Sequence, residues 1–448
     1  MTVGWRLRQH IFEPLHGLIS HSPKLHYWRE IEKTQYLPES QLREIQWQRL
    51  QEMLGIVAEQ NPYYRHQFAQ AKISPFDIKT PEDFLQIPIL TKADIRRSGI
   101  GMITDGYSVD RLHKAKTGGS TGKSLELFFT EECSELRNAC ARRHDRWTGW
   151  EPGEPIAACW GNPHLPTTLK AKLRQALLQP MVYLDTMSVN QVSVTEFVRE
   201  WRRLCPTLLY GHAHSIYLLA QHLKQMGIED LLPRGILSTS MMLLPSERKV
   251  IEDVFSTKAI DRYGCEEVGL IGCECEKHEG MHLNIEHLFV EFIKDDGSPC
   301  EPGETGRIVV TDLVNKAMPL VRYQVEDIGA PTKRQCSCGR GLPLMDSLMG
   351  RVADFLQKRD GTSVAGISLI EKTLTCFPGL DQMQIIQQKI DLFEINIVPG
   401  KLFSAEVLDD LRRYLEIVFG DGIAIKFFIK KQILPELSGK FRFSICRI

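Results

Sequence analysis

A run of glycine and hydroxyl side chains, residues 116–124 (KTGGSTGKS), constrains this chain more than any other stretch. Three glycines allow backbone N–H groups to approach a phosphate, while the hydroxyls add donors and two lysines add positive charge. The spacing differs from that of a Walker A loop. The same composition also suits a plain linker. The alternating segment that follows, 125–130 (LELFFT), is typical of a strand, so the run is predicted to be an ordered turn that binds polyphosphate.

Composition narrows the class of protein. The chain has 448 residues, 43% hydrophobic and 25% charged, with a net charge of -1, which is typical of a globular protein of a few domains. Near-neutral charge gives no electrostatic case for nucleic acid as the main partner. No apolar run approaches the roughly 20 residues of a transmembrane helix. The N-terminus is not a convincing signal peptide, so a cytoplasmic location is expected. For Trp5 to Ile19, a helix packed on the main domain is favoured over a surface role.

The order of apolar runs predicts an α/β fold. Strand-like runs such as 156–160, 208–210 and 236–239 alternate with helical ones, which favours a doubly wound sheet. From about residue 285 the chain becomes strand-rich, and a break falls near residue 350. Beyond it we expect a helix, two strands, a helix and a strand. The predicted organisation is a large multi-layer N-terminal α/β domain with a β-rich subdomain, 1–349, a connection, 350–354, and a small α+β C-terminal domain, 355–448.

Four further segments contain residues suited to nucleotide chemistry. The first is 263–267, which follows a predicted strand and ends in Glu267. A carboxylate at a strand end can hold Mg²⁺ beside phosphates. An acid in 322–327 could accept hydrogen bonds from ribose hydroxyls. The third segment is 350–354. The last, 438–442, places Lys440 on a glycine-flanked loop that can reach into a cleft, although a solvated tail lysine is the alternative.

The cysteines form a separate pattern. Twelve cysteines in 448 residues are too dilute for a disulfide scaffold, so clustered cysteines indicate a metal site or burial. Structural Zn²⁺ takes four thiolate or imidazole ligands in a tetrahedron. Buried free thiols beside a surface histidine pair are the alternative. The available ligands are Cys273, Cys275, His278, His282, Cys336 and Cys338.

Taken in order, these segments resemble the adenylate-forming superfamily of acyl-CoA synthetases, luciferases and nonribosomal peptide adenylation domains. The chain is most similar to the phenylacetate-CoA ligase branch, which includes the coenzyme F390 synthetase and capsule-locus relatives. The resemblance extends from about Tyr63 to the end of the chain. It is carried by residues 117–124, 263–269, 303–307, 318–323, 336–340 and 438–442.

The resemblance implies a role for each motif. Tyr263, followed by Gly264, would lie against adenine, and Glu267 would help to hold Mg²⁺. Asp327 would bind the ribose hydroxyls with help from Arg351. Lys440 would reach the substrate carboxylate and the α-phosphate. The residues that would close over the β- and γ-phosphates are Thr117, Gly118, Gly119, Ser120, Thr121, Gly122 and Lys123.

The implied reaction has two steps. A carboxylate displaces pyrophosphate from ATP to form an acyl-adenylate, and a second nucleophile, usually the thiol of coenzyme A, takes the acyl group. Family members rotate the C-terminal domain between the steps, so 350–354 would be a hinge. An amine, a hydroxyl or a carrier-protein thiol as acceptor, direct AMP transfer in polysaccharide or secondary-metabolite modification, and a non-enzymatic scaffold are the alternatives. A small-molecule acid and ATP are the expected partners, a homodimer and a carrier protein are further candidates, and the sequence does not determine the oligomeric state.

The resemblance also selects a zinc-ligand set. Related ligases carry a cysteine, a histidine seven residues later, and a later Cys-x-Cys-Gly-Arg. By that pattern the ligands of a structural Zn²⁺ are Cys275, His282, Cys336 and Cys338, with His278 and Cys273 as substitutes.

The sequence departs from the family in three places. Glu326 stands where a glycine usually precedes the ribose aspartate, Ala353 stands at the hinge position, and the adenine-side loop reads 238–242 (STSMM). An aryl or mixed-polarity acid suits the side chains that lie where family pockets form. These are Trp160, Asn162, His164, Tyr210, His212 and His214.

Overall fold

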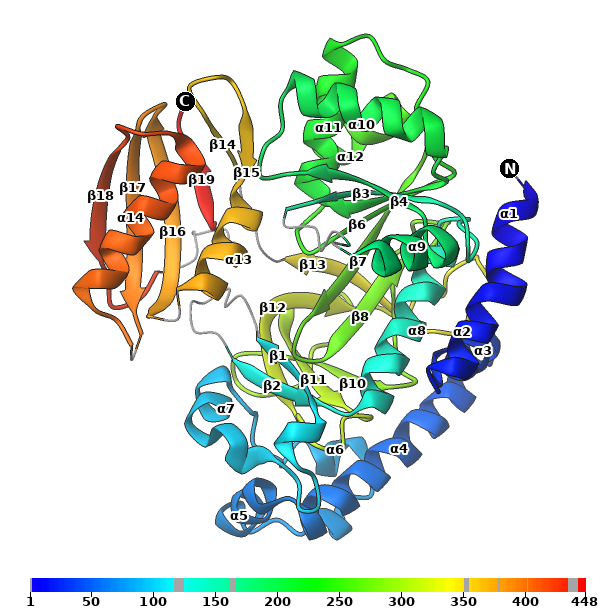
Figure 1. Ribbon diagram of the computed structural model, residues 1–448. Helices are drawn as coiled ribbons and strands as arrows, with labels where there is room; N and C mark the ends of the chain where they lie inside the picture. The colour runs from blue at the N-terminus through cyan, green and yellow to red at the C-terminus, as the bar shows by residue number, and fades with distance from the viewer. Residues whose placement is uncertain are drawn as a thin grey trace.

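The computed structural model describes residues 2–116, 125–161, 166, 168–349, 354–377, 379–400, 402–433 and 442–448. Among these residues the largest element is an eleven-stranded mixed sheet with the order β10-β11-β12-β13-β9-β8-β7-β6-β5-β3-β4 (Figure 1). Its parallel strands are β3 (Ile156–Trp160), β4 (Met181–Asp185), β5 (Leu208–His212), β6 (Gly235–Thr239) and β7 (Ala259–Cys265). The antiparallel continuation consists of β8 (Gly269–Glu274), β9 (Met281–Leu283), β10 (Leu288–Ile293), β11 (Gly306–Asp312), β12 (Tyr323–Pro331) and β13 (Leu344–Met349).

The predicted α/β class is confirmed, and the strand-rich segment after residue 285 extends the same sheet. The helices that accompany the parallel half are α8 (Glu131–Trp147), α9 (Leu169–Leu178), α10 (Gln191–Leu204), α11 (Ala213–Gln225) and α12 (Pro245–Phe255). Three of them, α8, α9 and α10, begin at side-chain caps, as at Asn190, which accepts hydrogen bonds from the first turn of its helix. The apolar faces of α10, α11 and α12 pack with the parallel strands in one core cluster. Buried residues of α8 belong to two other clusters.

The N-terminal third is mainly helical and runs along the outside of the sheet (Figure 1). Its elements are α1 (Thr2–Leu7), the π-helical η1 (Arg8–Phe12), α2 (Glu13–Ile19), α3 (Lys24–Thr34), α4 (Glu39–Gln60), α5 (Pro62–Ala71), α6 (Pro81–Phe84) and α7 (Lys92–Ser98). β1 (His113–Lys116) pairs antiparallel with β2 (Glu126–Phe129), so the predicted strand after the glycine run is confirmed. None of the described helices has the length and apolar character needed to cross a bilayer.

The C-terminal lobe has a four-stranded sheet of its own among the described residues, with the order β18-β17-β16-β19. The strands are β16 (Leu380–Lys389), β17 (Leu392–Pro399), β18 (Ala424–Ile429) and β19 (Ser444–Cys446), and the helices are α13 (Gly366–Cys376) and α14 (Ala405–Phe419). The helix–strand–strand–helix–strand order matches the prediction, and β19 is an addition. The hinge prediction stays a prediction, because residues 350–353 lie outside the described part of the chain.

A short hairpin joins the lobe to the larger part. It consists of β14 (Phe355–Gln357) and β15 (Ser363–Ala365). Val189 and Ser363 exchange two backbone hydrogen bonds of 2.9 and 2.8 Å, and Ala365 N–H donates to the Thr186 carbonyl at 2.8 Å. The Phe355 ring also stacks on His214 with 4.8 Å between centroids. The hairpin therefore belongs by contact to both parts of the molecule.

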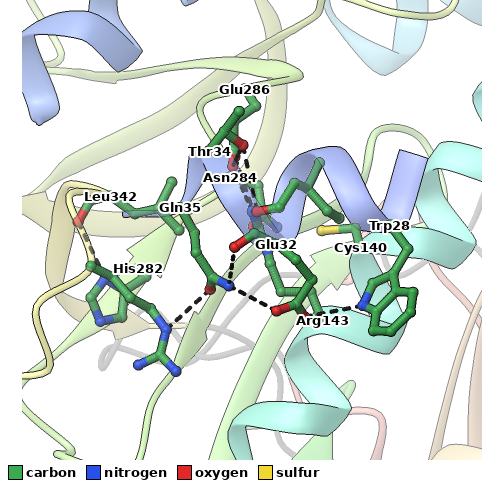
Figure 2. A network of polar contacts seen from close by, with 12 residues as sticks. Trp28, Glu32, Thr34, Gln35, Cys140, Arg143, His282, Asn284, Glu286 and Leu342 are labelled. Atoms are coloured by element: carbon green, nitrogen blue, oxygen red, sulfur yellow. Dashed lines mark hydrogen bonds and ion pairs between the residues drawn. The ribbon is translucent and has the colours of Figure 1, made fainter. Parts of the chain in front are cut away.

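A buried ion pair holds α3 and α8 to the loop before β10 (Figure 2). Arg143 is fully buried and pairs with Glu286, while its Nη2 donates to Asn284 Oδ1 at 2.7 Å. Burial alone would raise the pKa of Glu286, but the Arg143 guanidinium brings it below its usual value. Thr34, at the end of α3, donates to the same carboxylate at 3.3 Å. The N-terminal helices are thus coupled to the sheet through a charge pair with little access to water.

Replacing Glu286 with alanine is expected to destabilise the fold strongly, because Arg143 would keep a buried charge without a partner. We expect a loss of about 3–5 kcal/mol in the free energy of unfolding, measured by urea denaturation. Glu39→Ala, which breaks the exposed pair with Arg43, is the matched control and should cost less than about 1 kcal/mol. Equal losses in the two variants would contradict the role of burial.

Candidate functional site

The predicted adenine and ribose residues lie together at the centre of the large sheet. Tyr263 is near the end of β7 and Asp327 is on β12, and the Tyr263 hydroxyl donates to Asp327 Oδ2 at 2.9 Å. Both side chains are largely buried, at 7% and 9% exposure. β7 pairs in parallel with β6 on one side and antiparallel with β8 on the other. Its carboxyl end is therefore a change-over point in the sheet, where α/β folds commonly bind ligands.

Gly264 fits this position because the backbone of the next strand approaches closely. A Cβ atom at Gly264 would lie 2.6 Å from the Gly269 carbonyl oxygen and 2.9 Å from the Leu270 Cα. Any side chain here would push β7 away from β8. The requirement for glycine is thus local, and it keeps Tyr263 aligned with Asp327.

A small pocket of about 40 Å³ opens beside this pair. The loop after β6 forms one wall, and Ser240 in that loop has a left-handed backbone with φ 67°. Sequence reasoning pointed to this loop as the adenine side but assigned no residue in it. The lining residues beyond Tyr263, Gly264 and Asp327 are Ser240, Met241, Met242, Asp261, Arg262 and Leu348.

Glu267, the predicted magnesium residue, is buried among polar partners just beyond β7. The Tyr323 hydroxyl donates to Glu267 Oε1 at 3.0 Å. The Lys92 amine, at the start of α7, lies 3.8 Å from the same oxygen, and both side chains are only 4% exposed. The resemblance assigned no role to either partner. Lys92 comes from far upstream, so only the folded chain shows that a cation faces this carboxylate.

Arg137 on α8 fixes the loop that carries Glu267. Its guanidinium donates to the carbonyls of Glu266 and Glu267 at 3.1 and 2.9 Å and to Asp312 Oδ2 at 2.9 Å. It also lies over the Phe129 ring, 4.1 Å from the centroid, where β2 ends. One half-buried arginine therefore connects the Glu267 loop with the strand that follows the glycine run.

The other predicted nucleotide residues lie outside the described residues. These are Thr117, Gly118, Gly119, Ser120, Thr121, Gly122, Lys123, Arg351 and Lys440. Lys116 and Glu126, which flank the glycine run, are paired across β1 and β2. Downstream of Lys440, Arg442 pairs with Asp354, whose Oδ2 also accepts from Cys446 N–H at 3.0 Å. Asp354 is thereby attached to the last strand of the C-terminal lobe.

Three of the predicted acid-pocket residues form an aromatic group on the parallel strands. Trp160 stacks on Tyr210 at 5.4 Å, and its ring centroid is 3.9 Å from that of His212. Burial lowers the pKa of His212 to about 3, so the ring is neutral. Asn162 and His164 lie outside the described residues. His214 pairs with Glu247 and faces Phe355 of the C-terminal hairpin.

The four predicted zinc ligands converge. The ligand atoms of Cys275, His282, Cys336 and Cys338 all lie within 4.8 Å of one another. The Sγ atoms of Cys275 and Cys336 are 3.5 Å apart, and Cys338 Sγ is 3.4 Å from His282 Nε2. His282 Nδ1 lies 3.2 Å from the Leu342 carbonyl, a contact that favours a proton on Nδ1 and leaves Nε2 free as a ligand.

The proposed substitutes lie elsewhere. His278 contacts Glu274 through Nδ1 at 3.4 Å, and Cys273 is buried in β8 where it pairs with His282 through the backbone ladder. Among the described residues, the group able to hold a metal contains neither of them. The local pattern of six ligands is thus reduced to four by the direction in which the strands present each side chain.

The segment after α3 holds the cysteine loop in place (Figure 2). Gln35 is 1% exposed, and its Oε1 accepts from Trp147 Nε1 at 2.9 Å and from Arg340 Nε at 3.1 Å. Gly341 N–H donates to the Gln35 carbonyl at 2.9 Å. A Cβ at Gly341 would lie 1.8 Å from the Leu37 carbonyl oxygen, so the two backbones are in direct contact.

Comparison with known proteins agrees with this arrangement. Residues 356–447 match the family described as the CapK C-terminal domain. The phenylacetate-coenzyme A ligase of Thermus thermophilus is 27% identical over 83% of this chain and 84% of its own length. Protein CapK of Staphylococcus aureus is 23% identical over 94% of this chain and 93% of its own.

Solved structures share the fold. A 2-hydroxyisobutyryl-CoA ligase in complex with 2-HIB-AMP and CoA aligns with a TM-score of 0.63 and 17% identity over 93% of this chain and 92% of that one. The curated relatives support the resemblance of the chain to the phenylacetate-CoA ligase and CapK branch of the adenylate-forming superfamily. The solved structure shows the shared fold.

Asp261 in the pocket wall gives a pH-dependent prediction. Burial raises its pKa to about 7, although the Ser238 hydroxyl, 2.7 Å away, acts in the opposite direction. An unfolded aspartate titrates near about 3.9. The folded protein therefore binds this proton more tightly, and the contribution to stability is complete below about pH 4 and lost as the pH rises through about 7.

We expect Asp261→Asn, which cannot ionise but can still accept the Ser238 hydrogen bond, to unfold at a higher temperature than the parent at pH 8. The gap in melting temperature should narrow as the pH falls below about 7 and close near pH 4. Asp253→Asn, an exposed change on α12, is the control and should show no such pH dependence. A gap of the same size at both pH values would contradict a buried titrating aspartate.

Proposed function

We propose that this protein is an AMP-forming acid–CoA ligase. It would activate a carboxylic acid with ATP, release pyrophosphate and pass the acyl group to coenzyme A. The observation that carries the proposal is the meeting of Tyr263, Asp327 and Glu267 at the end of β7 in a chain that is similar over most of its length to phenylacetate-coenzyme A ligases. The acid is proposed to be aryl or related, because Trp160, Tyr210 and the neutral His212 offer flat apolar surfaces.

Each residue has a definite task in this proposal. Tyr263 would contact adenine while its hydroxyl orients Asp327, and Asp327, assisted by Arg351, would accept hydrogen bonds from the ribose. The backbone and hydroxyls of 117–123 would bind the β- and γ-phosphates. Glu267 would hold Mg²⁺, which neutralises phosphate charge when bound. The Lys92 amine, 3.8 Å away, would face the Glu267 carboxylate and offset its negative charge until then.

The first step is a displacement at phosphorus. A carboxylate oxygen of the acid bonds to the α-phosphorus as the bond to the β-phosphate oxygen breaks, and pyrophosphate leaves with the electron pair. Lys440 would neutralise the charge that builds on the α-phosphate oxygens. In the second step the sulfur of coenzyme A attacks the acyl carbon and AMP leaves. The thiol proton is released to solvent as the carbon–sulfur bond forms and the acyl–oxygen bond to AMP breaks. Positioning and charge stabilisation suffice for the first step, since a carboxylate nucleophile needs no general base.

A second candidate keeps the adenylation step and changes the acceptor. The match of residues 356–447 to the CapK C-terminal domain and the similarity to CapK over nearly the whole chain favour it. The C-terminal domain contributes to the acceptor side in the implied two-step reaction, so a capsule-type domain is compatible with an amine, a hydroxyl or a carrier-protein thiol. A homodimer stays a prediction for the assembly.

Pyrophosphate exchange separates the two candidates. The protein is incubated with ATP, Mg²⁺ and a panel of aryl and fatty acids, and exchange is followed with and without coenzyme A. The ligase proposal expects exchange with at least one acid and a thioester product when coenzyme A is added. Exchange without thioester would favour the other acceptors, whereas no exchange with any acid would favour AMP transfer or a scaffold. Lys440→Ala should abolish most exchange yet keep nucleotide binding, and Lys431→Ala on the same lobe is the matched control.

We also propose that Cys275, His282, Cys336 and Cys338 hold a structural Zn²⁺. Ligands about 2.3 Å from zinc at tetrahedral angles lie roughly 3.8 Å apart, and the contacts of 3.4 and 3.5 Å are close to this spacing. Backbone N–H groups of Lys277 and Arg340 point at the Cys275 and Cys338 sulfurs at 3.4 Å, which suits thiolates. Four protein ligands leave no open position, so the metal would stabilise the fold and take no part in the chemistry.

The zinc proposal predicts about one equivalent of zinc in the purified protein by elemental analysis. Cys336→Ser should lose most of this metal and lower the melting temperature by several degrees, because the metal-binding free energy contributes to folding. Cys376→Ser, at an exposed cysteine outside the cluster, should keep both. Less than about half an equivalent in the parent protein would favour buried free thiols.

A further inference from the structure

The outer face of the N-terminal helices is strongly apolar. Leu7, Ile11, Leu15 and Leu18 recur at intervals of four, four and three along α1, η1 and α2, and each is more than 40% exposed. Ile19 adds a further exposed side chain at the end of α2. Scattered exposed leucines are ordinary on a protein surface, but a continuous stripe along one face of a helix marks an interaction surface.

A second helix carries the same pattern. Leu169, Leu173 and Leu177 recur every four residues on α9 and are 83%, 59% and 40% exposed. No residue of α9 is classed as buried. α9 lies against η1, and a pocket of about 590 Å³ is lined mainly by residues of α2, α8 and α9. The two leucine stripes therefore belong to adjacent helices at one end of the molecule.

The N-terminal helix is attached to the body by its other face. Arg8 Nη1 donates to the Gly153 carbonyl at 3.1 Å, and a Cβ at Gly153 would lie 2.5 Å from the Trp5 carbonyl oxygen. Glu13 pairs with Arg142 and with Lys24. These contacts hold the polar face of the helix against the body of the protein. The leucine stripe on the opposite face is therefore exposed.

The exposed Arg and Lys side chains on α1 and α9 give this surface a positive charge. Arg6, Lys170, Lys172 and Arg174 are exposed. Across α1, η1, α2 and α9 the one acidic side chain among the described residues is Glu13, whose carboxylate is engaged by Arg142 and Lys24. The protein as a whole has a net charge of only -1, so this positive surface is a local concentration and not a general property.

We propose that α1–α2 and α9 together form a peripheral binding surface for an anionic phospholipid bilayer. Exposed leucines and isoleucines would enter the boundary between headgroups and acyl chains, while arginines and lysines beside them contact lipid phosphates. A protein surface would give the leucines a partner but would leave the exposed basic residues without an evident counter-charge. Anionic lipid satisfies both features at once, and each basic residue near such a surface adds attraction that salt screens.

Vesicle flotation with the full-length protein tests the proposal. We expect binding to vesicles of phosphatidylcholine with about one third phosphatidylglycerol, weak binding to pure phosphatidylcholine, and a decrease as the ionic strength rises. Lys170→Glu with Lys172→Glu, and separately Leu173→Glu with Leu177→Glu, should each reduce binding at least about tenfold. The matched control is Leu402→Glu with Ile417→Glu, at exposed aliphatic residues of the C-terminal lobe, and it should bind like the parent.

Two results would overturn the proposal. Absence of binding to anionic vesicles, or equal binding to both vesicle types, would exclude recognition of anionic lipid. A concentration-dependent dimer in sedimentation, dissociated by Leu173→Glu with Leu177→Glu while vesicles do not bind, would assign the surface to a second copy of the chain. Far-UV circular dichroism and pyrophosphate exchange of every variant report on folding and on the active site. Failure of the ligase assignment would thus be seen separately from failure of the membrane surface.

Discussion

The structure depends on the way in which β7 is paired. This strand has a parallel neighbour on one side and an antiparallel neighbour on the other, so its end lies where the two halves of the large sheet meet. Gly264 permits the close approach of β8, and the strand end then presents Tyr263 to Asp327 and leads into the loop of Glu267. Arg137 and Lys92 complete this centre from helices far away in sequence. The nucleotide site proposed at this point rests on the topology of the sheet as much as on the side chains.

The N-terminal region and the cysteine loop support that centre from outside. Arg143 and Glu286 form a buried charge pair between α8 and the loop before β10, and Gln35 joins the end of α3 to the backbone beside the cysteines (Figure 2). Both contacts place polar groups in the interior, where a partner of fixed geometry is required. The helices before residue 60 are therefore part of the same cooperative structure as the sheet, even though the motif resemblance begins only at about Tyr63.

The sequence predicted the α/β class, the C-terminal order of elements and the residues whose motifs are local. Tyr263 lies against Asp327, and the four predicted cysteine and histidine side chains converge at a separate place, because each motif sits on a strand end or turn whose place the fold determines. Their roles in nucleotide and zinc binding stay predictions. Lys92, Arg137 and Tyr323 received no role, because an ordinary lysine, arginine or tyrosine gains a function only from a contact made many residues away. The acceptor in the second reaction step could not be read either, since it depends on the surface between the lobes.

The hairpin at residues 355–365 limits how the C-terminal lobe can turn. Its strand β15 is hydrogen-bonded to the segment 186–190 of the larger part, while Asp354 is attached to β19 of the lobe. A swing of everything after residue 353 as one rigid piece would have to break the Val189–Ser363 pairing and separate Phe355 from His214. If those bonds persist, the point of rotation lies after Ala365 instead. The hydrogen bond from Cys446 N–H to Asp354, which attaches Asp354 to β19, must then break. Either way, the rotation proposed for the lobe would require more than a few hydrogen bonds to break, because Phe355, Leu356 and Val364 of the hairpin are buried in a core cluster shared by both parts.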